Sequence, residues 1–280
     1  MNAPDSNLVS TQWLADRLDD SNIVILDATL KKRPDGSLIN QAPICIKGAQ
    51  EFNYDTEVCD PNTDLPHMLP SVEQFEEAAR QRGISKDTLI VCYDALNVFC
   101  SPRAWWMFKI MGHQNVFVLD GGLPKWLEEN RPTQTQFSTP VSSGNFKATF
   151  HPGMVYNVDQ VLASIENSDI QTIDARSYGR FNATEPEPRP GMPGGHIPGS
   201  SCIPFNELLN NGCFKPVEEL KKIFETTLSP NATRTVFSCG SGVTASILAL
   251  AADECDYPNL AVYDGSWAEW GNRKDLPKET

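Results

Sequence analysis

The sequence repeats itself, and this repeat constrains the fold more than any other feature. The segment NIVILDATL at residues 22–30 is echoed by DIQTIDARSY at residues 169–178, and each is an apolar run that contains an Asp-Ala pair. The segment NVFVLDGGLPKW at residues 115–126 is echoed in the same way by NLAVYDGSWAEW at residues 259–270. We therefore expect two copies of one structural unit.

Stretches with helical periodicity separate the apolar runs. Strands that alternate with helices are typical of α/β units built around a mainly parallel sheet. We expect two such units, at residues 1–130 and 154–280, and a linker at residues 131–153 that follows the surface and is rich in Pro, Thr, Ser and Gln. The expected helices lie within residues 11–20, 71–80, 101–112, 157–167, 217–227 and 245–254.

Each half has a further apolar run, TLIVCYD at residues 88–94 and TRTVFSC at residues 233–239. Their alignment places Asp94 of the first half opposite Cys239 of the second. Cys239 opens the loop CGSGVTA, which leads into an expected helix, and such a loop directs N–H groups toward a bound anion. This setting lowers a thiol pKa from about 8.5 and makes the thiolate a nucleophile. A buried cysteine in a purely connecting loop is the alternative.

The other residues of this loop suit a substrate site. Gly240 and Gly242 allow positive φ angles and close backbone approach. Ser241 offers a hydroxyl, Val243 a packed anchor and Thr244 a hydroxyl at the start of the helix. The spacing of the loop leaves no room for a metal site.

The composition argues against several classes of function. The chain has 280 residues and a formal net charge of -13, which would repel a phosphate backbone, so nucleic-acid binding is not expected. No apolar stretch reaches about 18 residues, so no membrane association is expected. The eight cysteines form no C-x-x-C pair, and a chain of this size does not need disulfides. Without a signal-like N-terminus, we expect reduced cysteines and a cytoplasmic protein.

The duplication, the aspartate at position 94 and the loop CGSGVTA together make the chain resemble the two-domain rhodanese family over nearly its whole length. The family also has segments like GRFNATEPEPRPG at residues 179–191, GHIPGS at residues 195–200 and LPHMLP at residues 65–70. One departure is ICIKGA at residues 44–49, where the family usually repeats the GHIPGA turn. The resemblance implies two tandem rhodanese-like domains, of which only the second is catalytic.

The resemblance also implies a set of site residues. Arg180 and Arg189 would hold the carboxylate and the keto oxygen of 3-mercaptopyruvate, a task that suits planar guanidinium groups. His67 would handle protons together with Ser241 and an acidic residue, for which Asp55 is the candidate.

Structural roles remain the alternatives for the histidines. Between Pro66 and Pro70, His67 could simply be a hydrogen-bonded loop residue. His196, in the GHIPGS turn, is expected to be scaffold.

The implied reaction begins with Cys239 taking sulfur from 3-mercaptopyruvate and ends with a thiol, thioredoxin or cyanide as acceptor, without a metal or an organic cofactor. Loops of the CGSGVT type go with mercaptopyruvate in this family, whereas thiosulfate enzymes tend to have basic residues after the cysteine. Thiosulfate remains the alternative donor. A cysteine phosphatase would need arginine where Ala245 stands. A non-catalytic interaction module fits only the first half.

Overall fold

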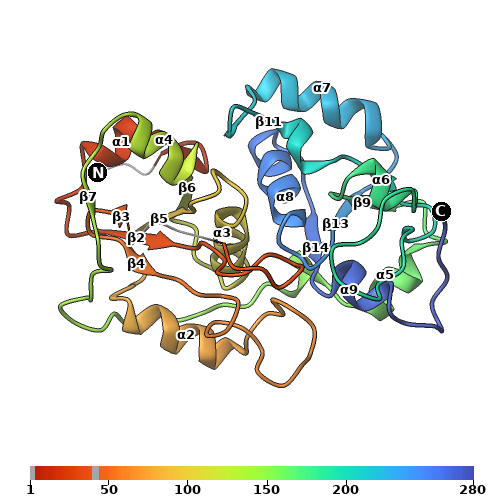
Figure 1. Cartoon of the computed structure of the whole chain (residues 1–280), viewed down its shortest axis with the longest axis horizontal. Coiled ribbons are helices and arrows are strands. Elements are labelled where there is room, and N and C mark those ends of the chain that lie inside the picture. Colours follow the sequence, from red (N-terminus) through yellow and green to blue (C-terminus); the bar gives the residue numbers. More distant parts are fainter. Residues whose placement is uncertain (1–3, 40–43) are drawn as a thin grey trace.

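The computed structural model describes residues 4–39 and 44–280, and it shows two units side by side (Figure 1). Each unit has a five-stranded sheet in which every neighbouring pair is parallel. In the first unit the order is β1 (Leu8–Val9), β6 (Val116–Leu119), β5 (Leu89–Tyr93), β2 (Ile23–Asp27) and β4 (Gln50–Glu51). In the second it is β8 (Val155–Tyr156), β14 (Leu260–Tyr263), β13 (Arg234–Ser238), β9 (Ile170–Asp174) and β10 (Ser201–Cys202). The two orders correspond strand by strand, which confirms the duplication.

Helices cover both faces of each sheet. The first unit contains α1 (Thr11–Ala15), α2 (Val72–Gln81), α3 (Ser101–Ile110) and α4 (Gly122–Glu128). The second contains α5 (Val158–Ser164), α6 (Tyr178–Phe181), α7 (Val217–Thr227), α8 (Ala245–Glu254) and α9 (Ser266–Trp270). Short 3-10 helices lie at Pro152–Met154 and Phe205–Leu208. All six expected helices are present, but the one predicted within residues 11–20 ends at Ala15, where turns replace it.

Three clusters of buried side chains form the core. One lies against α1 and α4 on the outer face of the first sheet, and another lies against α5 and α9 on the outer face of the second. The third and largest is continuous across the two units, because α3 of the first packs against α8 of the second. Since α3 follows the loop with Asp94 and α8 follows the loop with Cys239, the two equivalent loops both lie at the boundary between the units.

Polar contacts repeat this relation across the boundary. Asp120, which follows β6, accepts a hydrogen bond from the N–H of Phe214 in the second unit at 2.9 Å. Asp264, which follows β14, accepts one from the N–H of Leu69 in the first unit, also at 2.9 Å. The aspartate of each repeated Asp-Gly segment therefore forms a hydrogen bond with the other unit of the chain.

The stretch expected to be a linker follows the surface of the first unit. Within it, β7 (Thr133–Gln134) pairs antiparallel with β3 (Cys45–Ile46), and Phe146 packs against Phe75 and Phe108. A second small antiparallel pair, β11 (Leu209–Asn210) and β12 (Cys213–Phe214), belongs to the second unit. Among the residues that the structure describes, no helix is long and apolar enough to cross a membrane.

Candidate active site

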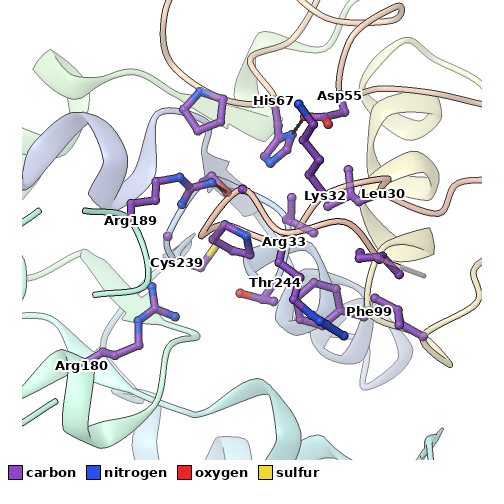
Figure 2. Close-up of a pocket in the computed structure, with 18 residues that line it drawn as sticks. Leu30, Lys32, Arg33, Asp55, His67, Phe99, Arg180, Arg189, Cys239 and Thr244 are labelled. Atoms are coloured by element: carbon purple, nitrogen blue, oxygen red, sulfur yellow. Dashed lines mark hydrogen bonds and ion pairs between the residues drawn. The ribbon is translucent and has the colours of Figure 1, made fainter. Parts of the chain in front are cut away.

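A cavity of about 440 Å³ lies between the two units, and Cys239 forms part of its wall. Side chains from both units surround it (Figure 2). The first unit contributes the turn after β2 and the loops that carry Asp55 and His67, and the second contributes the loop at residues 239–244 and two arginines. The lining residues are Leu30, Lys32, Arg33, Pro34, Gly36, Ile39, Asp55, Pro66, His67, Leu96, Phe99, Arg180, Arg189, Cys239, Gly240, Ser241, Val243 and Thr244.

Cys239 directly follows β13 and is only 1% exposed. The strand, loop and helix predicted around it are confirmed, with Thr244 at the N-cap of α8. In the described part of the chain, the N–H groups of Gly240, Ser241, Val243 and Thr244 donate to no acceptor, and all four residues line the cavity. Free N–H groups near a helix start favour an anion. The loop can therefore stabilise a negatively charged sulfur.

Ser266 and Gly242 fix the shape of the cysteine loop. The Ser266 hydroxyl accepts hydrogen bonds from the N–H of Cys239 at 3.2 Å and from that of Gly242 at 3.1 Å, and it donates to the carbonyl of Tyr263. Gly242 has a φ of +76°, and a Cβ there would lie 2.9 Å from Nη1 of Arg103. Glycine is therefore required at 242 by both backbone conformation and space.

The structure brings both predicted arginines to the cysteine loop. A Cβ on Gly240 would lie 3.0 Å from Nη2 of Arg180 and 3.5 Å from Nη1 of Arg189, so the two guanidinium groups lie against this residue. Arg189 also donates from Nη2 to the Ser241 hydroxyl at 3.1 Å. Burial lowers the pKa of Arg189, but a guanidinium stays charged in proteins. Two positive groups thus lie beside Gly240, next to Cys239, and together they could bind an anion.

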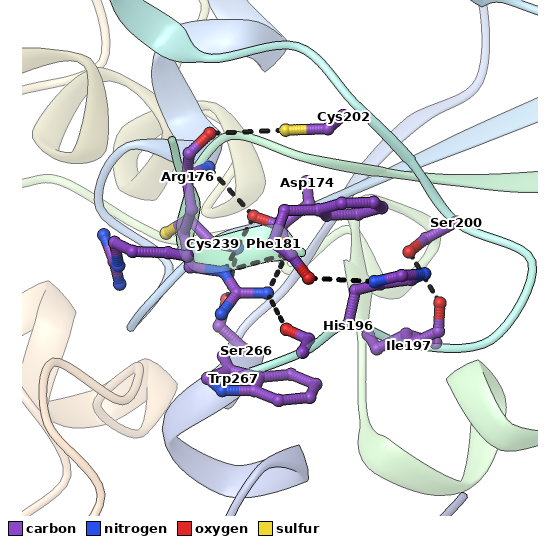
Figure 3. A network of polar contacts seen from close by, with 12 residues as sticks. Asp174, Arg176, Phe181, His196, Ile197, Ser200, Cys202, Cys239, Ser266 and Trp267 are labelled. Atoms are coloured by element: carbon purple, nitrogen blue, oxygen red, sulfur yellow. Dashed lines mark hydrogen bonds and ion pairs between the residues drawn. The ribbon is translucent and has the colours of Figure 1, made fainter. Parts of the chain in front are cut away.

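A buried ionic network holds Arg180 in place. The carboxylate of Glu187 accepts from Nε of Arg180 at 3.1 Å and from its Nη2 at 2.6 Å. The same carboxylate accepts from Nη1 of Arg176 at 2.7 Å. Arg176 is fully buried, makes a two-pronged contact with Asp174 and lies over the Trp267 ring (Figure 3). Sequence reasoning missed Glu187, although it lies within the segment at residues 179–191.

His67 and Asp55 also meet in the cavity. His67 Nδ1 lies 3.2 Å from Asp55 Oδ1, but the two atoms are not aligned for a regular hydrogen bond. Burial lowers the pKa of His67, whereas the contact with His67 lowers the pKa of Asp55. This pair therefore holds a neutral imidazole beside an ionised carboxylate at neutral pH. The Ser241 hydroxyl, predicted to act with His67, lines the same cavity and accepts a hydrogen bond from Arg189.

Arg103 and Asp264 link the histidine loop to the cysteine loop, and sequence reasoning missed both. Arg103 is fully buried on α3 and donates from Nη2 to the carbonyl of His67 at 2.5 Å and to Asp264 Oδ1 at 2.6 Å. His67 has a left-handed backbone with a φ of +61°, which this contact helps to hold. Asp264 belongs to the repeated Asp-Gly segment at residues 259–270, and this repeat is the sequence signal that could have pointed to its importance.

Asp94 directly follows β5 in the first unit, as Cys239 directly follows β13 in the second. Its carboxylate is fully buried and accepts hydrogen bonds from the N–H groups of Leu96, Cys100 and Ser101 and from the Ser101 hydroxyl. Burial raises the pKa of Asp94 to about 6, against the effect of these bonds. The equivalent loop of the first unit is thus filled by its own side chain.

His196 lies outside the cavity, in the packing of the second unit. Its ring stacks on Phe181 at 3.8 Å between centroids, and Nδ1 lies 2.9 Å from the Phe181 carbonyl (Figure 3). Its position agrees with the expected scaffold role. Within residues 4–39 and 44–280, no three His, Cys, Asp or Glu side chains are arranged to hold a metal ion.

Comparisons with known proteins agree with this architecture. The model of the rhodanese-like domain matches residues 10–129 and 157–273. The chain is 40% identical to the 3-mercaptopyruvate sulfurtransferase of Escherichia coli K12 over 275 residues, which cover 97% of each chain. It is 38% identical to thiosulfate/3-mercaptopyruvate sulfurtransferase 2 of Arabidopsis thaliana over 96% of this chain and 85% of the relative.

A solved structure extends the similarity to three dimensions. The crystal structure of a 3-mercaptopyruvate sulfurtransferase from Escherichia coli superposes with a TM-score of 0.82 and 35% identity, covering 94% of this chain and 99% of the other. Both the repeated domain and the full-length similarity therefore agree with the two equivalent sheets. The chain belongs to the rhodanese family, as a sulfurtransferase with two tandem rhodanese domains.

Proposed function

We propose that this chain transfers the sulfur of 3-mercaptopyruvate through a persulfide on Cys239 and releases pyruvate. One observation carries the proposal: a single cavity combines Cys239, the free N–H groups of its loop and the guanidinium groups of Arg180 and Arg189. The donor is the one named for the relative from Escherichia coli.

The first half-reaction uses the charges around the cysteine loop. Arg180 and Arg189 bind the carboxylate and keto oxygen of the donor, which directs its thiol toward Cys239. The Cys239 thiolate attacks the donor sulfur, and the bond between sulfur and C3 breaks. The electron pair of that bond forms the enolate of pyruvate, whose negative oxygen the same arginines stabilise.

The proton balance closes within the cavity. The proton of the donor thiol moves to C3 of the enolate, so pyruvate leaves and Cys239 remains as a persulfide anion. Ser241 and His67 are the groups that relay this proton, and Asp55 orients the imidazole. A hydroxyl bonded to Arg189 is a better proton donor, because the positive charge stabilises the oxygen left behind. Gly240, Gly242, Val243 and Thr244 shape the substrate site. The N–H groups of Gly240, Ser241, Val243 and Thr244 hold the persulfide, whereas that of Gly242 is bonded to Ser266.

In the second half-reaction a thiol, thioredoxin or cyanide removes the outer sulfur and restores the Cys239 thiolate, which gives ping-pong kinetics. Residues 154–280 act as the catalytic domain, residues 1–130 as a domain without a nucleophile and residues 131–153 as the connection between them. We place the protein in the cytoplasm, where its free cysteines stay reduced.

Thiosulfate is the second candidate donor, because relatives carry both donors in their names and two arginines next to Cys239 also suit an inorganic dianion. The test compares pyruvate release and persulfide formation with 3-mercaptopyruvate against persulfide formation with thiosulfate. Cys239→Ser should abolish both, whereas Cys255→Ser, at the other end of α8, should not. Faster loading by thiosulfate would reverse the donor assignment, and full activity in Cys239→Ser would refute the mechanism.

A further inference from the structure

Two cations of the first unit line the cavity and have no assigned role. Lys32 and Arg33 lie in the exposed turn after β2 and belong to the part of the cavity wall that the first unit forms (Figure 2). Neither side chain forms an ion pair within the described residues, but each lies near an acid. The pKa of Asp35 is lowered mainly by hydrogen bonds from Ser37 and further by Arg33, and the pKa of Asp55 is lowered mainly by His67 and further by Lys32. The neighbouring Lys31 points elsewhere and pairs with Glu51 at 2.7 Å.

The internal repeat makes this turn the equivalent of the segment that bears Arg180 in the second unit. In both units the aspartate that ends the second strand accepts from the N–H two residues later, Asp27 from Thr29 and Asp174 from Arg176. Counted from those aspartates, Arg33 occupies the same position in the first unit as Arg180 in the second. Helix α6, which bears Arg180, and the turn that bears Arg33 thus line one cavity from two sides.

The charged residues that line the cavity are mainly positive, whereas the chain as a whole is strongly acidic. The chain carries a formal net charge of -13, yet four of the residues that line this cavity are lysine or arginine and only one is acidic. That acid, Asp55, is already paired with His67. Beside the two unpaired cations lie the apolar side chains of Leu30, Ile39, Leu96 and Phe99. An anion attached to a short hydrocarbon chain fits this combination.

We infer that Lys32 and Arg33 form the binding site for the carboxylate of the sulfur acceptor, a small thiol that carries a negative charge. The inference rests on the proposed function, because it assumes a persulfide on Cys239. The acceptor thiolate attacks the outer sulfur, a new S–S bond forms, and the bond between that sulfur and Cys239 Sγ breaks. Cys239 leaves as a thiolate and the acceptor becomes a persulfide, with no net oxidation.

The direction of attack places the acceptor at this rim. A thiolate approaches a sulfur in line with the bond that breaks, so it must come from the side facing away from Cys239 Sγ. Cys239 is buried in the wall, whereas Lys32 and Arg33 are exposed at the rim. The donor carboxylate, by contrast, is expected at Arg180 and Arg189, beside Gly240. The two pairs of cations therefore serve the two half-reactions.

The experiment uses the full-length protein loaded with persulfide. After removal of the donor, loss of persulfide is followed with 3-mercaptopropionate, which is anionic, and with 2-mercaptoethanol, which is neutral and of similar size. The readout is the ratio of the two second-order rate constants, in which any loss common to both acceptors cancels. Replacing Lys32 and Arg33 together by alanine should lower this ratio about five- to tenfold, since each exposed pair contributes modestly.

Controls make the result decisive. Lys31→Ala removes one positive charge from the same turn, half of what the double variant loses, and should leave the ratio unchanged. The wild-type ratio should fall as salt rises, and the double variant should show little of this dependence. An unchanged ratio in the double variant overturns the inference, and so does an equal loss with both thiols. A loss confined to a protein acceptor such as reduced thioredoxin also overturns it.

The loading step reports separately on the proposed function. If 3-mercaptopyruvate forms no persulfide, the donor assignment fails, while inorganic polysulfide can still load Cys239 and the acceptor ratio is measured as before. The two failures are therefore distinguishable.

Discussion

Replacing Gly242 by alanine tests whether Arg103 of the first unit supports the cysteine loop through its close contact with Gly242. The new Cβ would lie 2.9 Å from Nη1 of Arg103 and 3.1 Å from the carbonyl oxygen of Asp264, on a backbone with a φ of +76°. The left-handed conformation costs an alanine about 1 to 2 kcal/mol. Overpacking against a guanidinium that is buried and held by Asp264 adds about 1 to 3 kcal/mol. The free energy of unfolding should therefore fall by roughly 2 to 5 kcal/mol.

Gly199 provides the matched control, because it has a φ of +72° and nothing within 4 Å of the position of a Cβ. Gly199→Ala should lose only the conformational part, about 1 to 2 kcal/mol, and should form persulfide at the wild-type rate. In Gly242→Ala the loop must shift, and persulfide formation should fall on the order of 100-fold. Urea unfolding and single-turnover loading measure the two effects. Equal stability losses in the two variants, with loading intact, would refute the support of the loop by Arg103.

Three further outcomes follow from the site. Glu187→Gln weakens the two-pronged contact with Arg180, so kcat/KM for 3-mercaptopyruvate should fall about tenfold or more in steady-state assays; an unchanged value would exclude this positioning. Burial lowers the folded pKa of His67 below 6.5, so stability from the neutral imidazole is complete above that pH and is lost as pH falls below it; urea titrations should show a smaller loss in His67→Gln. Asp94→Cys should still load one persulfide per chain by mass spectrometry, and two would contradict the single site.

Much of the fold followed from local sequence. The central strands are continuous apolar runs because they are buried on both faces, and the repeated segments marked them in both units. The edge strands β1, β4, β8 and β10 were not predicted. Each is two residues long, too short for any period to emerge, and each depends on a neighbouring strand to define it.

The candidate site divides in a similar way. Cys239 and its loop carry a local signal, since a strand, two glycines and a helix lie together in sequence. Arg103 carries none, because its importance arises from contacts with His67 and Asp264, which lie 36 and 161 residues away along the chain. The hydrogen bond from Arg189 to the Ser241 hydroxyl also has no local signal, because the position of Arg189 depends on how a proline-rich loop folds.

The duplication produces one site instead of two because the two units contribute different parts to the same cavity. The first unit's own loop is closed: Asp94 is fully buried and takes up the N–H groups of Leu96, Cys100 and Ser101. A cysteine introduced at 94 would face those groups without an opening toward substrate or an arginine pair beside it. The first unit instead turns His67 and its β2 turn toward the nucleophile of the second. In the proposed mechanism the first unit therefore contributes shape, positive charge and a proton relay to a cavity whose nucleophile comes from the second unit alone.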